Sequence, residues 1–119
     1  MEYVTKCGER GSLESLLPSG LSKPALIGYL RSCPVVLAAR TLLPDQYDPK
    51  AEDIPLAYLT DGEFVWSAET REYVNRYDFG LPEHFLRHVL TYRQTNGDEP
   101  RRVPKDLKDA ALRSINQSA

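Results

Sequence analysis

The chain contains an Asp-Gly pair, Asp61-Gly62, between two short runs rich in aromatic and apolar residues, PLAYLT and EFVWS. This arrangement is a strong signal for a β-hairpin whose two turn residues both adopt positive φ. Alternation along the second run places Phe64 and Trp66 on one face of a strand and Val65 on the other. We therefore expect a hairpin here, with Trp66, the only tryptophan, as a core anchor.

Nine prolines and seven glycines divide the remaining chain into short elements. Ser22 is a suitable N-cap for a helix over residues 23–32, because its hydroxyl can accept a free helical N–H. The wholly apolar run VVLAA, residues 35–39, predicts a strand buried on both faces. Further helices are expected over 67–80 and 82–93. The last predicted segments are an irregular N-terminal stretch at 1–21, a connector at 95–104 and a C-terminal helix at 105–116.

These elements predict an α+β fold, with a small antiparallel sheet of about three strands packed against three to four helices. At 119 residues the chain is long enough for one domain, 1–119, with its own core. Periodic apolar positions on the predicted strands and helices nominate that core: Phe64, Trp66, Tyr73, Val74 and Phe85.

Targeting and redox signals are sparse. No apolar run approaches the length of a membrane span, and the polar start MEYVTKCGERG does not read as a signal peptide. These features predict a cytoplasmic protein without a membrane partner. In that compartment Cys7 and Cys33 are expected to be reduced, and their spacing is not that of a zinc or redox motif.

Charge is distributed unevenly along the chain. Residues 45–83 carry ten acidic and three basic side chains, whereas both flanking segments carry more bases than acids. A nucleic-acid-binding protein needs a basic stripe, so direct nucleic-acid binding is not expected. The acidic middle segment could form a surface that docks onto a basic protein. The alternative is an ordinary acidic face exposed to solvent.

The segment 40–54 is a long polar stretch with two prolines and several carboxylates, and it predicts a surface loop. It lacks the alternating oxygen ligands of a calcium loop. Tyr47 has no periodic reason to be buried, and tyrosine is enriched at interface hot spots. We therefore nominate five partner-binding residues in this loop: Asp45, Tyr47, Asp48, Glu52 and Asp53.

His84 and His88 are four residues apart and would project from one side of a helix, a spacing that can chelate a metal. However, Phe85 stands where a zinc protease has glutamate, and the sequence suggests no third ligand. No nucleophile elbow, P-loop or dinucleotide fingerprint appears. We expect no cofactor and no catalysis, with a small hydrolase or metal-dependent enzyme using these histidines as the alternative.

Several short motifs resemble those of a group of small, largely uncharacterised bacterial proteins. They are Tyr29-Leu30, Thr60-Asp61-Gly62 followed by Trp66, Tyr73-Val74, and Leu81-Pro82-x-x-Phe85. Some proteins of this kind are similar to immunity proteins, which neutralise a toxin by binding it. The resemblance covers about half of the chain, and Cys33 replaces a glycine-like position in the pattern.

The resemblance implies a binding function, which agrees with the acidic, tyrosine-rich middle of the chain. An acidic surface can mimic the phosphate substrate of a basic nuclease. The expected function is an immunity-type inhibitor that binds a toxin or nuclease domain through an acidic surface. A regulatory or homodimeric subunit, pairing through a free strand edge, is a further alternative, so both monomer and homodimer remain open.

Overall fold

The computed structural model describes residues 1–118, which form four strands and five helices. The class is α+β, as the sequence predicts, but the sheet is mixed rather than antiparallel and has four strands rather than about three, with five helices rather than three to four. In chain order the elements are β1 (Glu2–Val4), α1 (Leu13–Leu16), α2 (Lys23–Ser32), β2 (Val35–Leu43), β3 (Ile54–Thr60), β4 (Phe64–Ser67), α3 (Ala68–Tyr77), α4 (Glu83–Asn96) and α5 (Lys105–Ser118).

The sheet is mixed, with strand order β1-β4-β3-β2. β2, β3 and β4 are antiparallel neighbours, while β1 pairs in parallel with β4, placing Val4 beside Trp66. β1 lies in the segment that we expected to be irregular. β1 has only three residues, too few to show the alternation of a strand in the sequence. It is recognised as a strand only by its pairing with β4.

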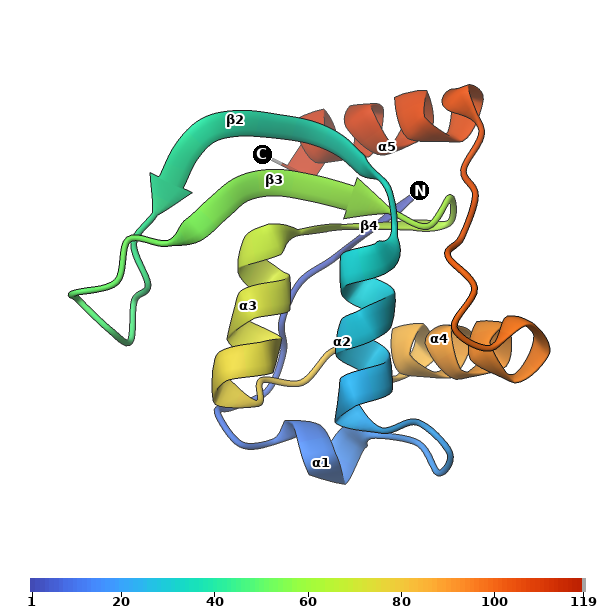
Figure 1. The fold of residues 1–119 in the computed structure, drawn as a ribbon, viewed down its shortest axis with the longest axis horizontal. Helices are drawn as coiled ribbons and strands as arrows, with labels where there is room; N and C mark the ends of the chain where they lie inside the picture. Colours follow the sequence, from blue (N-terminus) through green and yellow to red (C-terminus); the bar gives the residue numbers. More distant parts are fainter. Residues whose placement is uncertain (119) are drawn as a thin grey trace.

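Two helical layers cover the sheet. α2, α3 and α4 pack on one face, and α5 lies against the other (Figure 1). The alternation in β4 agrees with this arrangement. Trp66 belongs to the main core, whereas Val65 packs with Ala111 and Ile115 of α5. The three helices on the main-core side therefore enclose most of the apolar side chains.

The residues nominated for the core lie on the main-core side. Trp66, Tyr73, Val74 and Phe85 are each at most 1% exposed, and Phe64 is half-buried. The Trp66 indole donates a hydrogen bond to the Leu30 carbonyl oxygen at 3.3 Å. Its ring also packs edge-on against Phe85, with 5.6 Å between centroids. Trp66 thus connects the hairpin to both α2 and α4.

The hairpin turn differs in detail from the expected one. Gly62 has φ of 95°, but Asp61 is not among the residues with positive φ, so the expectation for Asp61 was wrong. Instead, the Asp61 Oδ1 accepts the backbone N–H groups of Glu63 and Phe64 at 2.9 and 2.8 Å. The turn is therefore stabilised by hydrogen bonds to the Asp61 side chain, and it does not have the positive φ at both residues that was expected.

β2 is the clearest correction. It extends to Leu43, and most of it is exposed, whereas VVLAA was expected to be buried on both faces. Val35, Leu37 and Leu42 are 54%, 45% and 58% exposed. The reason is position, because β2 is the last strand of the sheet and β3 alone pairs with it among the described residues.

The helix boundaries follow local signals. Ser22 and Ser67 accept the N–H groups of Ala25 and Thr70, capping α2 and α3. α3 ends at Tyr77, short of the expected residue 80, and its C-cap Asp78 adopts the left-handed conformation. Within residues 1–118, no helix combines the length and apolar character needed to cross a membrane.

Candidate functional site

The loop between β2 and β3 forms the far end of a hairpin that reaches away from the rest of the chain (Figure 1). Its exposed residues Tyr47, Asp48, Glu52 and Asp53 are here called the acidic tip. All four were nominated from the sequence as partner-binding residues. The structure therefore places three carboxylates and one aromatic ring in one accessible loop, which also carries the exposed Lys50.

Asp45, the fifth nominated residue, lies elsewhere. It is only 2% exposed, so it does not face a partner as expected. Its Oδ2 accepts the Tyr77 hydroxyl at 2.7 Å and the Arg76 guanidinium at 3.0 Å. Its Oδ1 accepts the backbone N–H of Tyr47 at 2.8 Å. Asp45 is thus the anchor that fixes the base of the loop to α3.

The electrostatics of this anchor follow from its contacts. Burial is the largest single influence and acts to raise the pKa of Asp45. Hydrogen bonds from Tyr77, Tyr47 and Arg76 outweigh burial and hold that pKa below its ordinary value. The bond to Asp45 in turn raises the pKa of Tyr77 to about 12. Asp45 is therefore ionised at neutral pH.

Packing holds the rest of the loop. The Tyr47 ring lies 5.0 Å from that of Tyr77, and the Arg10 guanidinium lies 4.8 Å from the Tyr47 centroid. The Tyr73 hydroxyl accepts the Gln46 backbone N–H at 3.1 Å. Arg76 also binds Asp53 at 2.9 Å, which partly neutralises that member of the acidic tip. The tip is consequently a preformed surface.

A second polar cluster surrounds Asp61, which the sequence had identified only as a turn residue. Asp61 is 1% exposed. Its Oδ2 accepts the Tyr29 hydroxyl at 2.5 Å and contacts the His88 Nε2 at 2.8 Å. Arg101 completes the cluster, with one guanidinium nitrogen 2.5 Å from Glu63 and another 3.5 Å from both the Tyr29 hydroxyl and the His88 Nε2.

Several hydrogen-bonding groups converge on the Asp61 carboxylate. Burial tends to raise the pKa of Asp61, but donors from His88, Tyr29 and the backbone outweigh it and leave the pKa below its usual value. An ionised carboxylate can only accept, so the proton between the two side chains is on His88 Nε2. Burial and the Asp61 charge raise the pKa of Tyr29 well above its usual range.

This carboxylate–imidazole pair resembles part of a catalytic triad, but the described residues supply no nucleophile within hydrogen-bond distance of His88. Cys33 is buried, and burial raises the pKa of its thiol to about 12. That thiol stays protonated at neutral pH and is a poor nucleophile. Both cysteines are free in the described chain.

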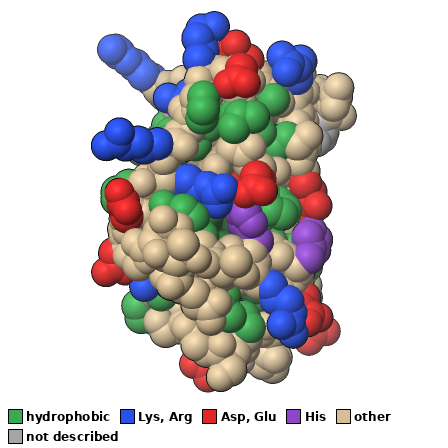
Figure 2. Space-filling model, turned by 90° about the vertical axis from the view of Figure 1, so that its right-hand side faces the viewer, with side chains coloured by type: hydrophobic (Ala, Val, Ile, Leu, Met, Phe, Trp, Pro, Cys, Tyr) green, Lys and Arg blue, Asp and Glu red, His purple; other side chains and the backbone are tan. Residues whose placement is uncertain are grey.

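The two histidines have separate partners. His84 is exposed and lies 2.6 Å from the Glu2 carboxylate, whereas His88 turns inward to Asp61. Both are visible beside acidic and basic side chains in the middle of one face (Figure 2). Across residues 1–118, no group of three or more His, Cys, Asp or Glu side chains is placed to hold a metal ion.

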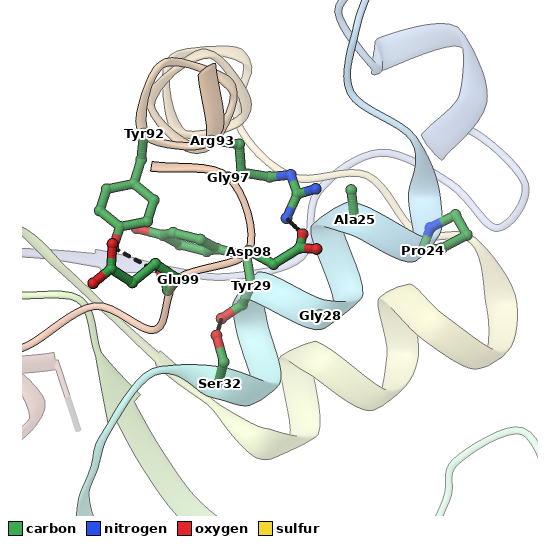
Figure 3. Close-up of a pocket in the computed structure, with 10 residues that line it drawn as sticks. All are labelled: Pro24, Ala25, Gly28, Tyr29, Ser32, Tyr92, Arg93, Gly97, Asp98 and Glu99. Atoms are coloured by element: carbon green, nitrogen blue, oxygen red, sulfur yellow. Dashed lines mark hydrogen bonds and ion pairs between the residues drawn. The ribbon is translucent and has the colours of Figure 1, made fainter. Parts of the chain in front are cut away.

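A shallow pocket lies between α2 and the segment after α4 (Figure 3). The ion pair between Arg93 and Asp98, 2.8 Å long, and the Tyr92 hydroxyl bonded to the Glu99 carbonyl oxygen form one side of it. Ala25 and Gly28 of α2 form the other side. These polar groups satisfy one another, which indicates that they fasten the connector to α4.

Comparison of the chain with protein-family models, with curated proteins and with solved structures found no match. The functional argument therefore rests on the two polar clusters and the exposed surfaces. Of these, the acidic tip is the site whose side chains are directed to solvent and lack full internal pairing among the described residues.

Proposed function

We propose that this chain is a non-catalytic protein-binding module that binds a basic protein through the acidic tip. The observation that carries the proposal is the anchoring of the tip by Asp45. A loop held by a buried carboxylate and packed tyrosines loses little conformational freedom when a partner binds. A preformed surface of this kind is typical of tight inhibitors.

The chemistry of the tip defines the partner. Asp48 and Glu52 are exposed carboxylates with no cation bound to either among the described ion pairs. Complementary charge speeds encounter and fixes register, so a partner with clustered Lys and Arg fits best. Tyr47, at 38% exposure, offers an aromatic side chain to such a contact.

Within this class, we propose an immunity-type role, in which the partner is a bacterial toxin such as a nuclease domain. The support is the resemblance of the hairpin and helix motifs to immunity proteins, together with the acidic tip. Basic nuclease sites bind phosphate, and a rigid array of carboxylates can occupy the same positive potential. Such inhibition needs no catalytic residue in this chain.

The test is coexpression with the protein encoded by the neighbouring gene, followed by purification through a tag on that protein. We expect a stable complex whose formation weakens as salt rises, because the contact is electrostatic. We also expect cells expressing the neighbouring protein to survive only with this chain present. Absence of both complex and protection would contradict the immunity-type role.

A further inference from the structure

β2 combines three features that rarely occur together on a free strand. It is nine residues long, it ends the sheet, and most of its side chains are exposed. Val35, Leu37 and Leu42 are about half exposed, and Arg40 is its only charged residue. Among residues 1–118, no strand lies on its outer side, so that edge presents unpaired backbone N–H and C=O groups.

Edge strands in monomeric proteins are usually protected by lysine, proline, inward-pointing charges or β-bulges. Prolines stand at positions 34 and 44, just outside the strand, and β2 itself contains neither lysine nor proline. Two irregularities in its pairing with β3, between Val35 and Leu37 and between Ala38 and Leu42, bend the strand. Residues 37–42 nevertheless remain exposed.

The two ends of β2 carry opposite charge. The strand leads directly into the loop that holds the acidic tip. At its start it follows the last turn of α2, which carries the exposed Arg31, and Val36 packs against α5. α5 carries three basic and two acidic side chains, Lys105, Lys108 and Arg113 against Asp106 and Asp109, and Figure 2 shows both kinds at the end of the molecule that α5 occupies.

We propose that the outer edge of β2 pairs with the same edge of a second copy of this chain, antiparallel and about a two-fold axis. Two-fold interfaces bring the same patch of both copies together, so the patch must be self-complementary. Antiparallel pairing meets this requirement, because it places the acidic end of each strand beside the basic end of the other. Each favourable contact then forms twice.

The register also avoids a like-charge clash. With the axis between Leu37 and Ala38, Arg40 lies opposite Val35 of the second copy, and the two arginines are far apart. Leu37 then lies opposite Ala38 of the second copy. Opposed apolar pairs stabilise an antiparallel ladder, whereas like charges directly opposite destabilise it. The strand can therefore pair with itself at no electrostatic cost.

This proposal does not depend on the partner described above. Dimerisation is measured on the chain alone, and partner binding is measured with the second protein, so failure of one leaves the other standing. Because the acidic tip serves both contacts, excess partner should compete with the second copy.

The experiment is sedimentation velocity of the full chain over a concentration series reaching about 1 mM, a range that detects even weak association. We compare wild type with Val35→Lys and Leu37→Lys, which place a charge at exposed positions of the proposed ladder. Leu16→Lys is the matched control, because Leu16 is an exposed leucine (37%) on α1, outside the sheet. Circular dichroism establishes that each variant is folded.

We expect a monomer–dimer equilibrium whose dissociation constant rises at least about tenfold in the edge variants and is unchanged in Leu16→Lys. Wild-type amide exchange at residues 35–40 should slow as concentration rises. A wild-type chain that stays monomeric throughout would overturn the proposal. So would a dimer whose β2 amides exchange equally fast at all concentrations, whatever the fate of the variants.

Discussion

Asp61 uses its two carboxylate oxygens for two different structures. Oδ1 accepts two backbone N–H groups and closes the β3–β4 turn, while Oδ2 binds Tyr29 and His88 in the interior. A buried carboxylate costs several kcal/mol in lost hydration unless its lone pairs are satisfied. Four donors meet that requirement here, so the turn and the interface between α2 and α4 form one unit.

Replacing Asp61 with Asn should lower the free energy of unfolding by roughly 3 kcal/mol, because the amide has one accepting oxygen and its NH2 group cannot accept the two donors that the second carboxylate oxygen binds. Chemical denaturation of both proteins at neutral pH measures the difference. Asp98→Asn is the control, since Asp98 is paired but exposed, and it should change stability by less than about 1 kcal/mol. An Asp61→Asn protein as stable as wild type would contradict a structural role for this network.

The pH dependence has a definite sign. The pKa of Asp61 is lower in the folded protein than its ordinary value of 3.8, so the folded state favours the ionised form. Its contribution to stability is therefore complete above that value and disappears as pH falls through the folded pKa. The stability gap between wild type and Asp61→Asn should narrow on acidification below about pH 4. A gap that widens would contradict this assignment.

The sequence could not predict this residue-scale cluster. The Asp-Gly pair marks a turn, but His88 and Tyr29 are 27 and 32 residues away from Asp61. No spacing rule connects them, because they meet only after the hairpin packs on α2 and α4. Asp45 was nominated for its charge but is buried. Its charge does not reveal that Arg76 and Tyr77 lie close enough to pair with it.

At the scale of elements, locally encoded features were predicted well. Ser22 and Ser67 cap their helices because capping requires only residues within one turn. The burial of β2 was predicted wrongly for the opposite reason. An apolar run does not reveal whether a neighbouring strand or helix will cover it, and β2 ends the sheet. β1 was missed because a three-residue strand depends on its partner.

Trp66 supports the central element, the β3–β4 hairpin. It is fully buried and contacts α2 and α4, so Trp66→Ala should cost roughly 3–5 kcal/mol through the cavity it leaves. Leu42→Ala, at a residue 58% exposed, should change stability by less than about 0.5 kcal/mol. Thermal unfolding of both variants measures this contrast, and an unchanged melting temperature for Trp66→Ala would refute it.

The segment before α5 depends on Arg101. Its guanidinium binds Glu63 and lies 4.9 Å from the Tyr92 ring centroid. Arg101→Gln should cost about 1–2 kcal/mol and speed amide exchange in α5, because it removes a charge-assisted hydrogen bond. The neighbouring exposed Arg102→Gln is the matched control and should do neither. Equal exchange rates in both variants would show that Arg101 does not hold this segment.

At the scale of the whole molecule, the structure separates a stable body from a charged extension. The body is built around Trp66 and the Asp61 network, and the β2–β3 hairpin carries the acidic tip outward (Figure 1). Only three of the ten acidic side chains in residues 45–83 lie on this tip, and Asp45 and Asp61 are among those that are buried. The rigidity of the tip, supplied by Asp45, could not be read from composition.

The most direct test of this account is calorimetric titration of the protein encoded by the neighbouring gene into wild type and two double variants. Asp48→Asn/Glu52→Gln removes two charges from the acidic tip while keeping side-chain shape. Glu14→Gln/Asp106→Asn removes two exposed charges elsewhere. The account predicts binding that is about tenfold weaker for the tip variant and unchanged for the control. Equal affinity for all three proteins, or no binding to wild type, would contradict it.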